Sequence, residues 1–398
     1  MLCSVVILNW NGESMLRQFL PSVLQHTQLP DVEIVVADNG STDGSLDYLQ
    51  TMPVRIIELG ENYGFAEGYN RAIEQVEAEY TVLLNSDVEV TPHWLETMLA
   101  YMNANPETLA AQPKVLSWHS KQLFDRGEAK AIRFEHAGAA GGMMDMLGYP
   151  YCRGRIMSHV EEDHGQYDQV TPIFWATGAC MLVRTKIYKQ LGGLDANFFA
   201  HQEEIDLCWR IWTLPPSTSP LKGENSLPSK GWLGRIVCLP QAVVYHVGGG
   251  TLGYESPRKT FLNFRNNLLM LRKNLPLSRL WWVMVVRFFM DYIAALQMLL
   301  TGQIPNAKAV FQARCEYHKM KRLYPVGRFA MGRRSAYRTL RYRTASPIGR
   351  KQSFLQDAAE PLQDARGRID RPRNKRNALK LLAKRSIVFD FYIRKKKQ

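Results

Sequence analysis

Residues 33–44 read EIVVADNGSTDG, an apolar run that passes at Asp38 into a polar segment with two glycines. Residues 3–12, CSVVILNWNG, and residues 80–89, YTVLLNSDVE, repeat this pattern. Amphipathic stretches lie between the runs, around residues 14–26, 44–52 and 66–76. Short apolar runs that alternate with amphipathic stretches are typical of βαβαβ units, so the sequence predicts an α/β fold with a mostly parallel sheet flanked by helices.

Ligands of such sheets bind beyond the carboxyl ends of the strands. Polar residues follow all three runs at this position: Asn9, Trp10 and Asn11, then Asp38, then Asn85, Ser86, Asp87 and Glu89. These segments contain neither G-x-G-x-x-G nor G-x-x-x-x-G-K-[ST], so they do not support a dinucleotide site or a P-loop.

Carboxylates at these strand ends suggest a nucleotide or a metal site. Asp38 could act only as a turn residue or helix cap, or it could accept hydrogen bonds from a base or ribose. Asp87 and Glu89 are two residues apart, which predicts that their side chains share one face. A divalent cation there would bridge a carboxylate and a diphosphate, whereas the alternative is an acidic sheet edge without function.

A third acidic group lies at residues 199–210, FAHQEEIDLCWR. Glu203, Glu204 and Asp206 fall in the first turn of a predicted helix, where the helix dipole favours negative charge whatever its role. Asp206 and Arg210 are also spaced to pair on one helix face. Three neighbouring carboxylates can nevertheless raise one another's pKa, as a general base at neutral pH requires.

His246 ends a later apolar run, just before three consecutive glycines. A lone histidine at such a position is often a packed core residue. Beside Asp87, however, its imidazole would be a suitable second ligand for a cation.

These segments, in this order, resemble the motifs of glycosyltransferase family 2, whose members adopt the GT-A fold, and within it the bacterial rhamnosyltransferase-like and galactofuranosyltransferase-like members. The motifs are VVILNWNG, VVADNGSTDGS, NYGFAEGYN, LLNSDVEV, ATGACMLVR, GGLDANFF, HQEEIDLCWR and YHVGGGT. The resemblance covers about residues 1–275 and implies a Rossmann-like sheet and a transferase that uses a nucleotide-diphosphate sugar.

The resemblance also implies which residues bind the donor. Residues 9–11 and Asp38 would line the nucleotide, while Asn62, Gly64 and Asn70 would lie near the diphosphate and the sugar. The expected donor site is completed by Trp10, Asn85, Ser86 and Asp87.

The implied cofactor is a divalent cation, Mg²⁺ or Mn²⁺. Asp87 matches the last Asp of the family's D-x-D element, in which Asn85 stands at the first position. His246 matches the histidine that joins the metal, and Glu89 is a further candidate ligand.

The implied chemistry is one inverting displacement with a carboxylate base. The family's E-D pair, whose second member is the base, corresponds to Glu203 and Glu204. Glu204 is therefore the first candidate for the base, with Glu203 second and Asp206 a further candidate. The alternative from another class is a non-catalytic, membrane-associated protein that binds a nucleotide sugar or carbohydrate on the same fold.

Cysteines and the N-terminal residues bear on the compartment. The six cysteines show no C-x-x-C spacing, so neither a disulfide framework nor a zinc knuckle is suggested. The first residues lack the basic and long apolar regions of a signal peptide. We therefore expect a cytoplasmic protein.

The C-terminal part predicts attachment to a membrane. Residues 280–300 are apolar and long enough to span a bilayer, but Arg287 and Asp291 lie near their middle. A helix lying in the membrane interface avoids burying these charges in lipid, whereas a core helix and a spanning helix are the alternatives. Residues 308–398 carry 26 Lys and Arg against 6 Asp and Glu, which favours an anionic membrane surface over nucleic acid as the partner.

The predicted organisation has three parts. Residues 1–275 form the transferase domain, in which residues 214–231, with four prolines, are an inserted low-complexity loop. Residues 276–325 form amphipathic, membrane-associating helices, and residues 326–398 form a basic tail that is partly disordered. The expected reaction moves a sugar from a dTDP- or UDP-sugar, with rhamnose as one candidate, to a lipid-linked or polysaccharide acceptor at the inner face of the cell membrane.

Overall fold

The computed structural model describes residues 1–214, 235–248, 256–326 and 386. The predicted loop at 214–231, beyond its first residue, and the predicted tail at 326–398, apart from its first residue and residue 386, lie outside the described residues.

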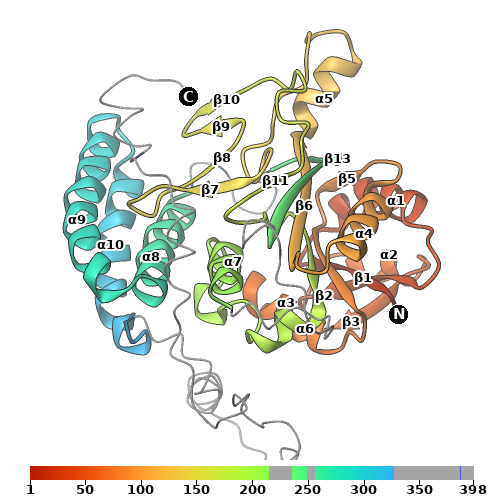
Figure 1. The fold of residues 1–398 in the computed structure, drawn as a ribbon, viewed down its shortest axis with the longest axis horizontal. Coiled ribbons are helices and arrows are strands. Elements are labelled where there is room, and N and C mark those ends of the chain that lie inside the picture. The colour runs from red at the N-terminus through yellow and green to blue at the C-terminus, as the bar shows by residue number, and fades with distance from the viewer. Residues whose placement is uncertain (215–234, 249–255, 327–385, 387–398) are drawn as a thin grey trace, which may run out of the picture.

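The N-terminal part of the chain forms the predicted alternation of strands and helices (Figure 1). Its elements are β1 (Cys3–Asn9), α1 (Glu13–His26), β2 (Val32–Asp38), α2 (Ser45–Leu49), β3 (Arg55–Glu58), α3 (Gly64–Glu74) and β4 (Tyr80–Asn85). β1 pairs in parallel with both β2 and β4, and β2 pairs in parallel with β3. The predicted βαβαβ unit is confirmed, and β3 is an additional edge strand.

Later strands extend this sheet on the β4 side. They and their helices are β5 (Val88–Val90), α4 (Trp94–Ala104), β6 (Ala110–Ser117), α5 (Trp118–Asp125), β11 (Thr171–Pro172), β12 (Cys180–Arg184), α6 (Thr185–Gln190) and β13 (Ile236–His246). The strand order is β11-β13-β6-β12-β4-β1-β2-β3, with β5 paired to β13. Because β12 runs antiparallel to β4, the start of β12 lies beside the carboxyl end of β4.

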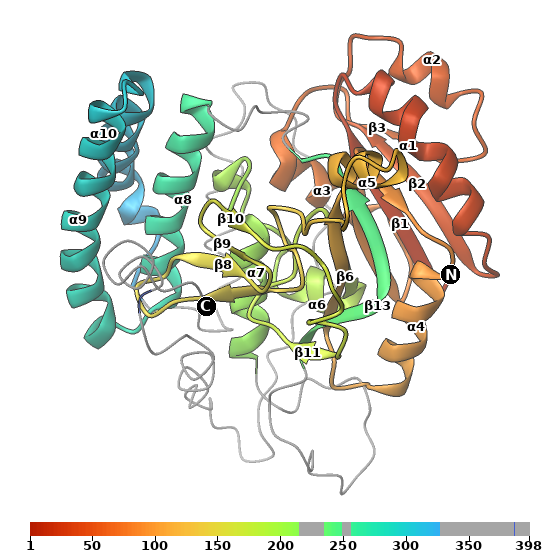
Figure 2. The ribbon, with the colours of Figure 1, turned by 90° about the horizontal axis from the view of Figure 1, so that it is seen from above.

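Residues 115–170 form mostly loops and short strands, apart from residues 115–117, which end the central strand β6, and the helix α5. A separate small sheet contains β7 (Gly142–Met144), β8 (Pro150–Cys152), β9 (Arg155–Ile156) and β10 (His159–Val160). Figure 2 shows these strands between the main sheet and the C-terminal helices.

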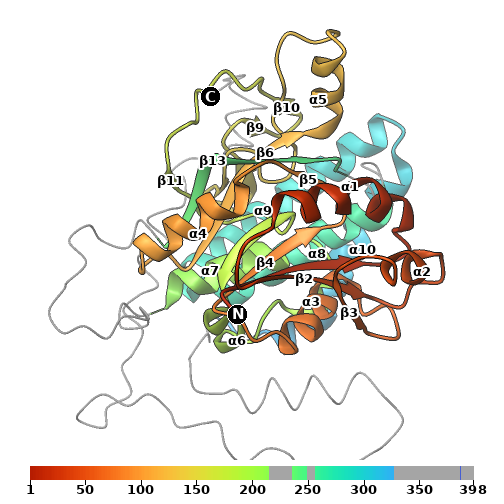
Figure 3. The same cartoon turned by 90° about the vertical axis from the view of Figure 1, so that its right-hand side faces the viewer.

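Helices cover both faces of the main sheet (Figure 3). On one face, α1 and α4 bury an apolar cluster that includes Leu20, Trp94 and Met98. On the other, α3, α6 and the helix α7 (Glu203–Thr213) bury a second cluster that includes Tyr69 and Trp209. Burial of apolar area on both faces is the main source of stability for such a layered fold.

Three long helices form a group at one side of the molecule, on the left of Figure 1. They are α8 (Pro257–Asn274), α9 (Leu277–Leu300) and α10 (Ile304–Met320), followed by the short 3-10 helix η3 (Lys321–Leu323). α8 packs against α10 and also contacts α7. The group is therefore joined to the sheet domain through α8.

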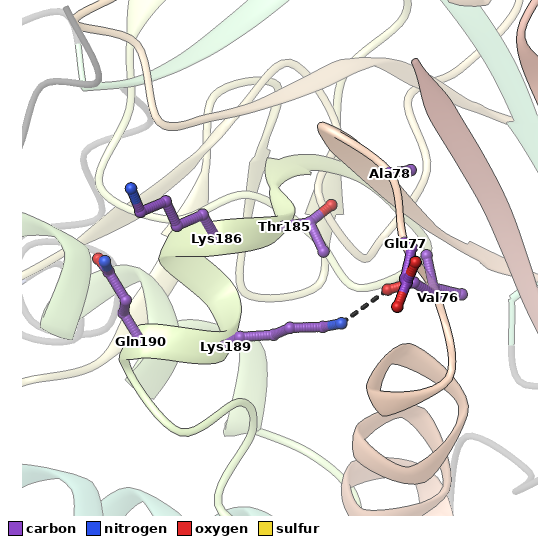
Figure 4. A pocket seen from close by; sticks show the side chains of 7 residues that line it. All are labelled: Val76, Glu77, Ala78, Thr185, Lys186, Lys189 and Gln190. Atoms are coloured by element: carbon purple, nitrogen blue, oxygen red, sulfur yellow. Dashed lines mark hydrogen bonds between the residues drawn. The ribbon is translucent and has the colours of Figure 1, made fainter. Parts of the chain in front are cut away.

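A surface depression of about 420 Å³ lies at the amino end of β4 (Figure 4). Residues 76–78, Thr185, Lys186, Lys189 and Gln190 line it, and Lys189 Nζ donates a hydrogen bond to the carbonyl of Val76 at 2.6 Å. The polar residues singled out by the sequence lie at the opposite, carboxyl end of β4, so this depression is separate from them.

Candidate active site

The ends of β1 and β2 are joined by side-chain hydrogen bonds. Asn9 Nδ2 donates to Asp38 Oδ1 at 3.1 Å and to Ser41 Oγ at 3.1 Å. The other oxygen of Asp38 accepts from the backbone N–H of Ser41 at 2.9 Å. Asp38 therefore organises the turn after β2, as the turn hypothesis proposed, and holds that turn against β1. Asn9 Oδ1 is buried without a hydrogen-bond partner among the described residues.

The loop after β1 is fixed in the same way. Asn11 has a positive φ of 49° and accepts a hydrogen bond from the backbone N–H of Thr42 at 2.7 Å, while its own N–H donates to Ser41 Oγ at 2.9 Å. Trp10 beside it is 44% exposed. The side chain of Trp10 is thus an exposed aromatic ring between two ordered loops at the sheet edge.

Asn62 and Gly64 lie against the same edge, through Asn39. Asn39 Nδ2 donates to Asn62 Oδ1 and to the carbonyl of Gly64, both at 3.2 Å. Gly64 has a φ of +76°, and a Cβ there would lie 2.4 Å from the ring of Phe199, so only glycine fits. The sequence prediction did not single out Asn39, because an Asn in a turn is common and carries no signal of its own.

Asn70 has a different role from the predicted one. Its amide nitrogen donates to the carbonyl of Leu194 at 2.9 Å, and its amide oxygen accepts from the N–H of Leu194 and the hydroxyl of Tyr188, both at 2.8 Å. These contacts use both ends of the amide to hold the GGLD segment. We therefore correct the donor-site prediction for Asn70 to a structural role.

Asp87 and His246 meet at the carboxyl end of β4, as predicted. Their Oδ1 and Nε2 atoms are 3.2 Å apart, and Asn85 Nδ2 lies 3.4 Å from the same imidazole nitrogen. Ser86 forms the turn between Asn85 and Asp87. Burial alone would raise the pKa of Asp87, but the charge and hydrogen bond of His246 hold it below its usual range.

Glu135 is a further member of this group. Its Oε2 lies 3.4 Å from His246 Nδ1, so the imidazole stands between two carboxylates. Burial would lower the pKa of His246, but Asp87 and Glu135 raise it to about 10. Glu135 precedes His246 by more than one hundred residues and belongs to no motif, so this contact could not be predicted from the sequence.

Glu89 does not join this group. Its carboxylate accepts a hydrogen bond from Trp118 Nε1 at 2.9 Å and pairs with Lys121 Nζ at 3.3 Å. Both partners belong to α5. Asp87 lies in the turn before β5 and Glu89 within it, so strict alternation does not apply to the pair. The structure thus places the Glu89 carboxylate against α5, whereas Asp87 is a partner of His246.

The segment before α7 is held in an unusual conformation. Phe199, His201 and Gln202 have positive φ values of 65°, 69° and 74°. Such values are rare for residues other than glycine and persist where the surrounding structure fixes them. Asn266 of α8 does so here, because its Nδ2 lies within 2.9 Å of the carbonyls of Phe198, Ala200 and His201.

This conformation directs two carboxylates into a buried place. Glu203 Oε2 and Glu204 Oε2 are buried and have no hydrogen-bond partner among the described residues. Burial raises the pKa of Glu204 to about 7; burial and the neighbouring Glu204 together raise the pKa of Glu203. A Cβ at Gly178 would lie 3.8 Å from Glu204 Cβ, and the carbonyl of the next residue, Ala179, accepts a hydrogen bond from the N–H of Asn85 at 3.0 Å. Glu204 is therefore close to the carboxyl end of β4.

Asp206 is fully buried and fully paired. It accepts hydrogen bonds from Arg210 Nε at 2.8 Å, Lys273 Nζ at 2.7 Å and Asn274 Nδ2 at 2.8 Å. Burial alone would raise the pKa of Asp206, but the charges of Lys273 and Arg210 hold it below its usual range. We correct Asp206 from candidate base to structural ion pair, as its spacing from Arg210 had also allowed.

Asp87 and His246 fit a cation shared with a diphosphate. In the described part of the chain, no group of three or more His, Cys, Asp or Glu side chains is arranged to hold a metal ion by itself. Mg²⁺, however, often takes only one or two protein ligands together with substrate phosphates, and imidazole suits transition metals. A facing carboxylate and imidazole at the sheet edge meet this need.

The comparisons with known proteins identify a family and a fold. Residues 4–192 match the family model described as glycosyl transferase family 2. A relative named N-acetylglucosaminyl-diphospho-decaprenol L-rhamnosyltransferase, from Mycobacterium tuberculosis, is 26% identical over 255 residues, 61% of this chain and 75% of the relative. The low-salt glycan biosynthesis hexosyltransferase Agl10 of Haloferax volcanii is 20% identical over 271 residues, 67% of this chain and 74% of the relative.

One solved structure supports the fold. GalNAc-T7 with UDP, GalNAc and Mn²⁺ superposes with a TM-score of 0.50 at 14% identity, over 86% of this chain and 58% of that chain. The predicted GT-A fold and the predicted family are thus both confirmed. Residues 4–192 of this chain therefore match glycosyl transferase family 2, and the chain is similar in sequence to an L-rhamnosyltransferase.

Proposed function

We propose that the chain transfers a sugar from a nucleotide-diphosphate donor to a hydroxyl group of a lipid-linked or polysaccharide acceptor, with inversion at the anomeric carbon. The observation that carries the proposal is Glu204, a carboxylate with a raised pKa and an unpartnered oxygen, close to the strand end that holds Asp87 and His246.

Glu204 is the proposed general base. Its pKa of about 7 suits a group that must be ionised near neutral pH and must still accept a proton. The acceptor hydroxyl gives its proton to Glu204 as its oxygen bonds to the anomeric carbon, and the bond from that carbon to the diphosphate oxygen breaks. Glu203, the neighbouring residue, is the second candidate. It ranks below Glu204 because its side chain is more deeply buried.

The donor would lie along the carboxyl edge of the sheet. Trp10 offers an exposed ring beside Asn9, Asn11 and Asp38, a place suited to a nucleoside. The diphosphate would then reach Asp87 and His246. A divalent cation held by these two residues would offset the charge that develops on the departing diphosphate.

The acceptor and the location are inferred from a relative. The name of the mycobacterial relative describes an acceptor on a decaprenyl diphosphate. A comparable lipid-linked acceptor would place this chain at the cytoplasmic face of a membrane as a peripheral protein. Because the same relative is named an L-rhamnosyltransferase, dTDP-rhamnose is the first donor to test, followed by UDP-sugars.

The test is nucleotide release by the purified chain from a panel of dTDP-, UDP- and GDP-sugars, with and without a short-chain lipid diphosphate sugar as acceptor. We expect acceptor-dependent release with one donor class and loss of release in excess EDTA. A protein that binds one donor tightly but releases nothing under all these conditions would be the non-catalytic binder instead.

A further inference from the structure

The outward surface of α9 is almost entirely apolar. From Trp281 to the end of the helix, every exposed residue except Gln297 is apolar. Trp281, Phe289 and Ile293 are 64%, 61% and 58% exposed. The other exposed apolar residues of α9 are Leu277, Val285, Phe288, Leu296, Leu299 and Leu300. We call these nine residues the α9 face.

The charges of α9 point the other way, into the protein. Arg287 Nε donates to Asp291 Oδ1 at 3.1 Å, and Arg314 of α10 donates to Asp291 Oδ2 at 3.1 Å. Arg287 also donates to Asn267 of α8 at 2.5 Å and lies 3.9 Å from the ring centroid of Tyr149. Both charges of the pair are therefore satisfied inside the helix group, and neither would meet lipid.

The apolar surface continues onto α10. Phe288 and Tyr292 have ring centroids 4.8 Å apart, and Tyr292 and Phe311 of α10 are 5.1 Å apart. Phe311 and Ile304 are themselves 46% and 50% exposed. The apolar surface of α9 thus extends to these two residues of α10, and its contiguity distinguishes it from the single exposed apolar residues of an ordinary soluble protein.

We propose that the α9 face lies in the apolar layer of a lipid bilayer, with α9 parallel to the membrane plane. α9 is the one described helix long and apolar enough to cross a membrane, but only 22% of its most apolar 18-residue window is buried, so it is not an ordinary core helix. A crossing would separate α9 from α8 and α10 and would carry Arg287 and Asp291 into hydrocarbon.

Lipid fits this surface better than a second copy of the chain does. The helix of 24 residues is about 36 Å long, and its exposed side offers almost no polar group for specific pairing in a protein interface. Trp281 near its start suits the headgroup boundary, and the 26 Lys and Arg after residue 307 complement anionic lipid. The proposal rests on the proposed function for its biological purpose, but not for its test.

The experiment is flotation of the full-length protein with vesicles, in the absence of donor and acceptor. The vesicles are phosphatidylcholine alone, or phosphatidylcholine mixed with phosphatidylglycerol. The variant Phe289→Glu/Ile293→Glu places two charges on the α9 face at positions that are more than half exposed. Phe124→Glu, at a 44% exposed position of α5, is the matched control.

We expect the wild type and Phe124→Glu to float with both vesicles, and the double variant to bind each at least about tenfold more weakly. Equal flotation of all three proteins would overturn the proposal, because the basic residues alone would then hold the protein. A dimer in sedimentation that the double variant dissociates, with unchanged flotation, would overturn it in favour of a second copy.

Two further measurements keep the result independent of folding and of the proposed activity. Circular dichroism and donor-nucleotide binding in solution should be unchanged in the double variant. If the two charges disturb the fold, Phe289→Ser/Ile293→Ser is the neutral replacement, and it should lose less flotation than the charged variant. Failure to float with intact nucleotide release would reject the membrane surface alone, whereas flotation without nucleotide release under any condition would reject the proposed function alone.

Discussion

The start of α7 and the middle of α9 both bury charged side chains, but only one of them provides a partner for every charge. At α9, Arg287, Asp291 and Arg314 form a chain of ion pairs, and Asn267 completes it. At α7, Glu203 and Glu204 each keep a buried oxygen without a hydrogen bond among the described residues.

This difference distinguishes the structural ion pairs of α9 from the proposed catalytic carboxylate of α7. An unpartnered buried carboxylate is destabilising, because it has lost its water and gained no hydrogen bond in return. Folding alone would favour a neutral side chain at Glu204, and the proposed role of Glu204 as the general base would account for this cost. The α9 pairs need no such explanation. The carboxylate of Asp291 is paired with two arginines, and these pairs fix α9 against its neighbours.

Glu204→Gln should give the largest effect. The substitution keeps the shape of the side chain but removes the basic oxygen, so the rate of transfer should fall by about 10²–10⁴-fold. Donor-nucleotide binding should persist. Steady-state nucleotide release with the best donor measures the rate, and calorimetry measures binding.

The control for this variant is Glu96→Gln on α4. Glu96 also has a buried oxygen without a hydrogen bond among the described residues, but it lies away from the strand ends. Its rate should match that of the wild type. Near-normal transfer by Glu204→Gln would move the proposed base to Glu203.

Breaking the α9 network should act on folding instead. Asp291→Leu leaves Arg287 and Arg314 buried without their carboxylate, and loss of one partner of a buried pair costs about 3–5 kcal/mol of unfolding free energy. Denaturant unfolding followed by circular dichroism measures this. Arg287→Met/Asp291→Leu/Arg314→Met should recover most of the loss, and a single variant as stable as the wild type would contradict the structural role.

Glu135 allows a smaller test at the cation site. If Glu135 orients His246, Glu135→Gln should weaken binding of Mn²⁺ in the presence of donor nucleotide by about 10–100-fold, the usual effect of removing a group that supports a metal ligand. Electron paramagnetic resonance of free Mn²⁺ gives the affinity without any turnover. Glu128→Gln at an exposed position is the control, and equal affinities would remove Glu135 from the site.

A last test concerns pH and stability. Burial raises the pKa of Glu204 from 4.5 to about 7, so the folded protein binds more protons than the unfolded chain between these values. Stability should therefore fall as pH rises from about 4.5 to about 7, by roughly 3 kcal/mol at most. Glu204→Gln should flatten this part of the profile, and an unchanged slope would mean that another group titrates.

Features formed by residues close together in the sequence could be predicted, whereas contacts between distant residues could not. The strand ends with Asn9, Asp38 and Asp87 followed from local apolar runs and the topology of parallel sheets. The contacts of Glu135 with His246 and of Asp206 with Lys273 join distant segments, which periodicity does not pair. The sequence also showed that α9 has a polar side, but not that this side faces the protein, because its neighbours α8 and α10 decide that.

The link from α9 to the segment before α7 sets a fixed geometry. Asn267 accepts from Arg287 of α9 and donates to Gln202 Oε1 at 3.2 Å, and Gln202 immediately precedes Glu203 and Glu204. With α9 resting in lipid, this short polar connection would hold Glu204 at a constant height above the bilayer. The protein would then select an acceptor hydroxyl by its distance from the lipid anchor as well as by its chemistry.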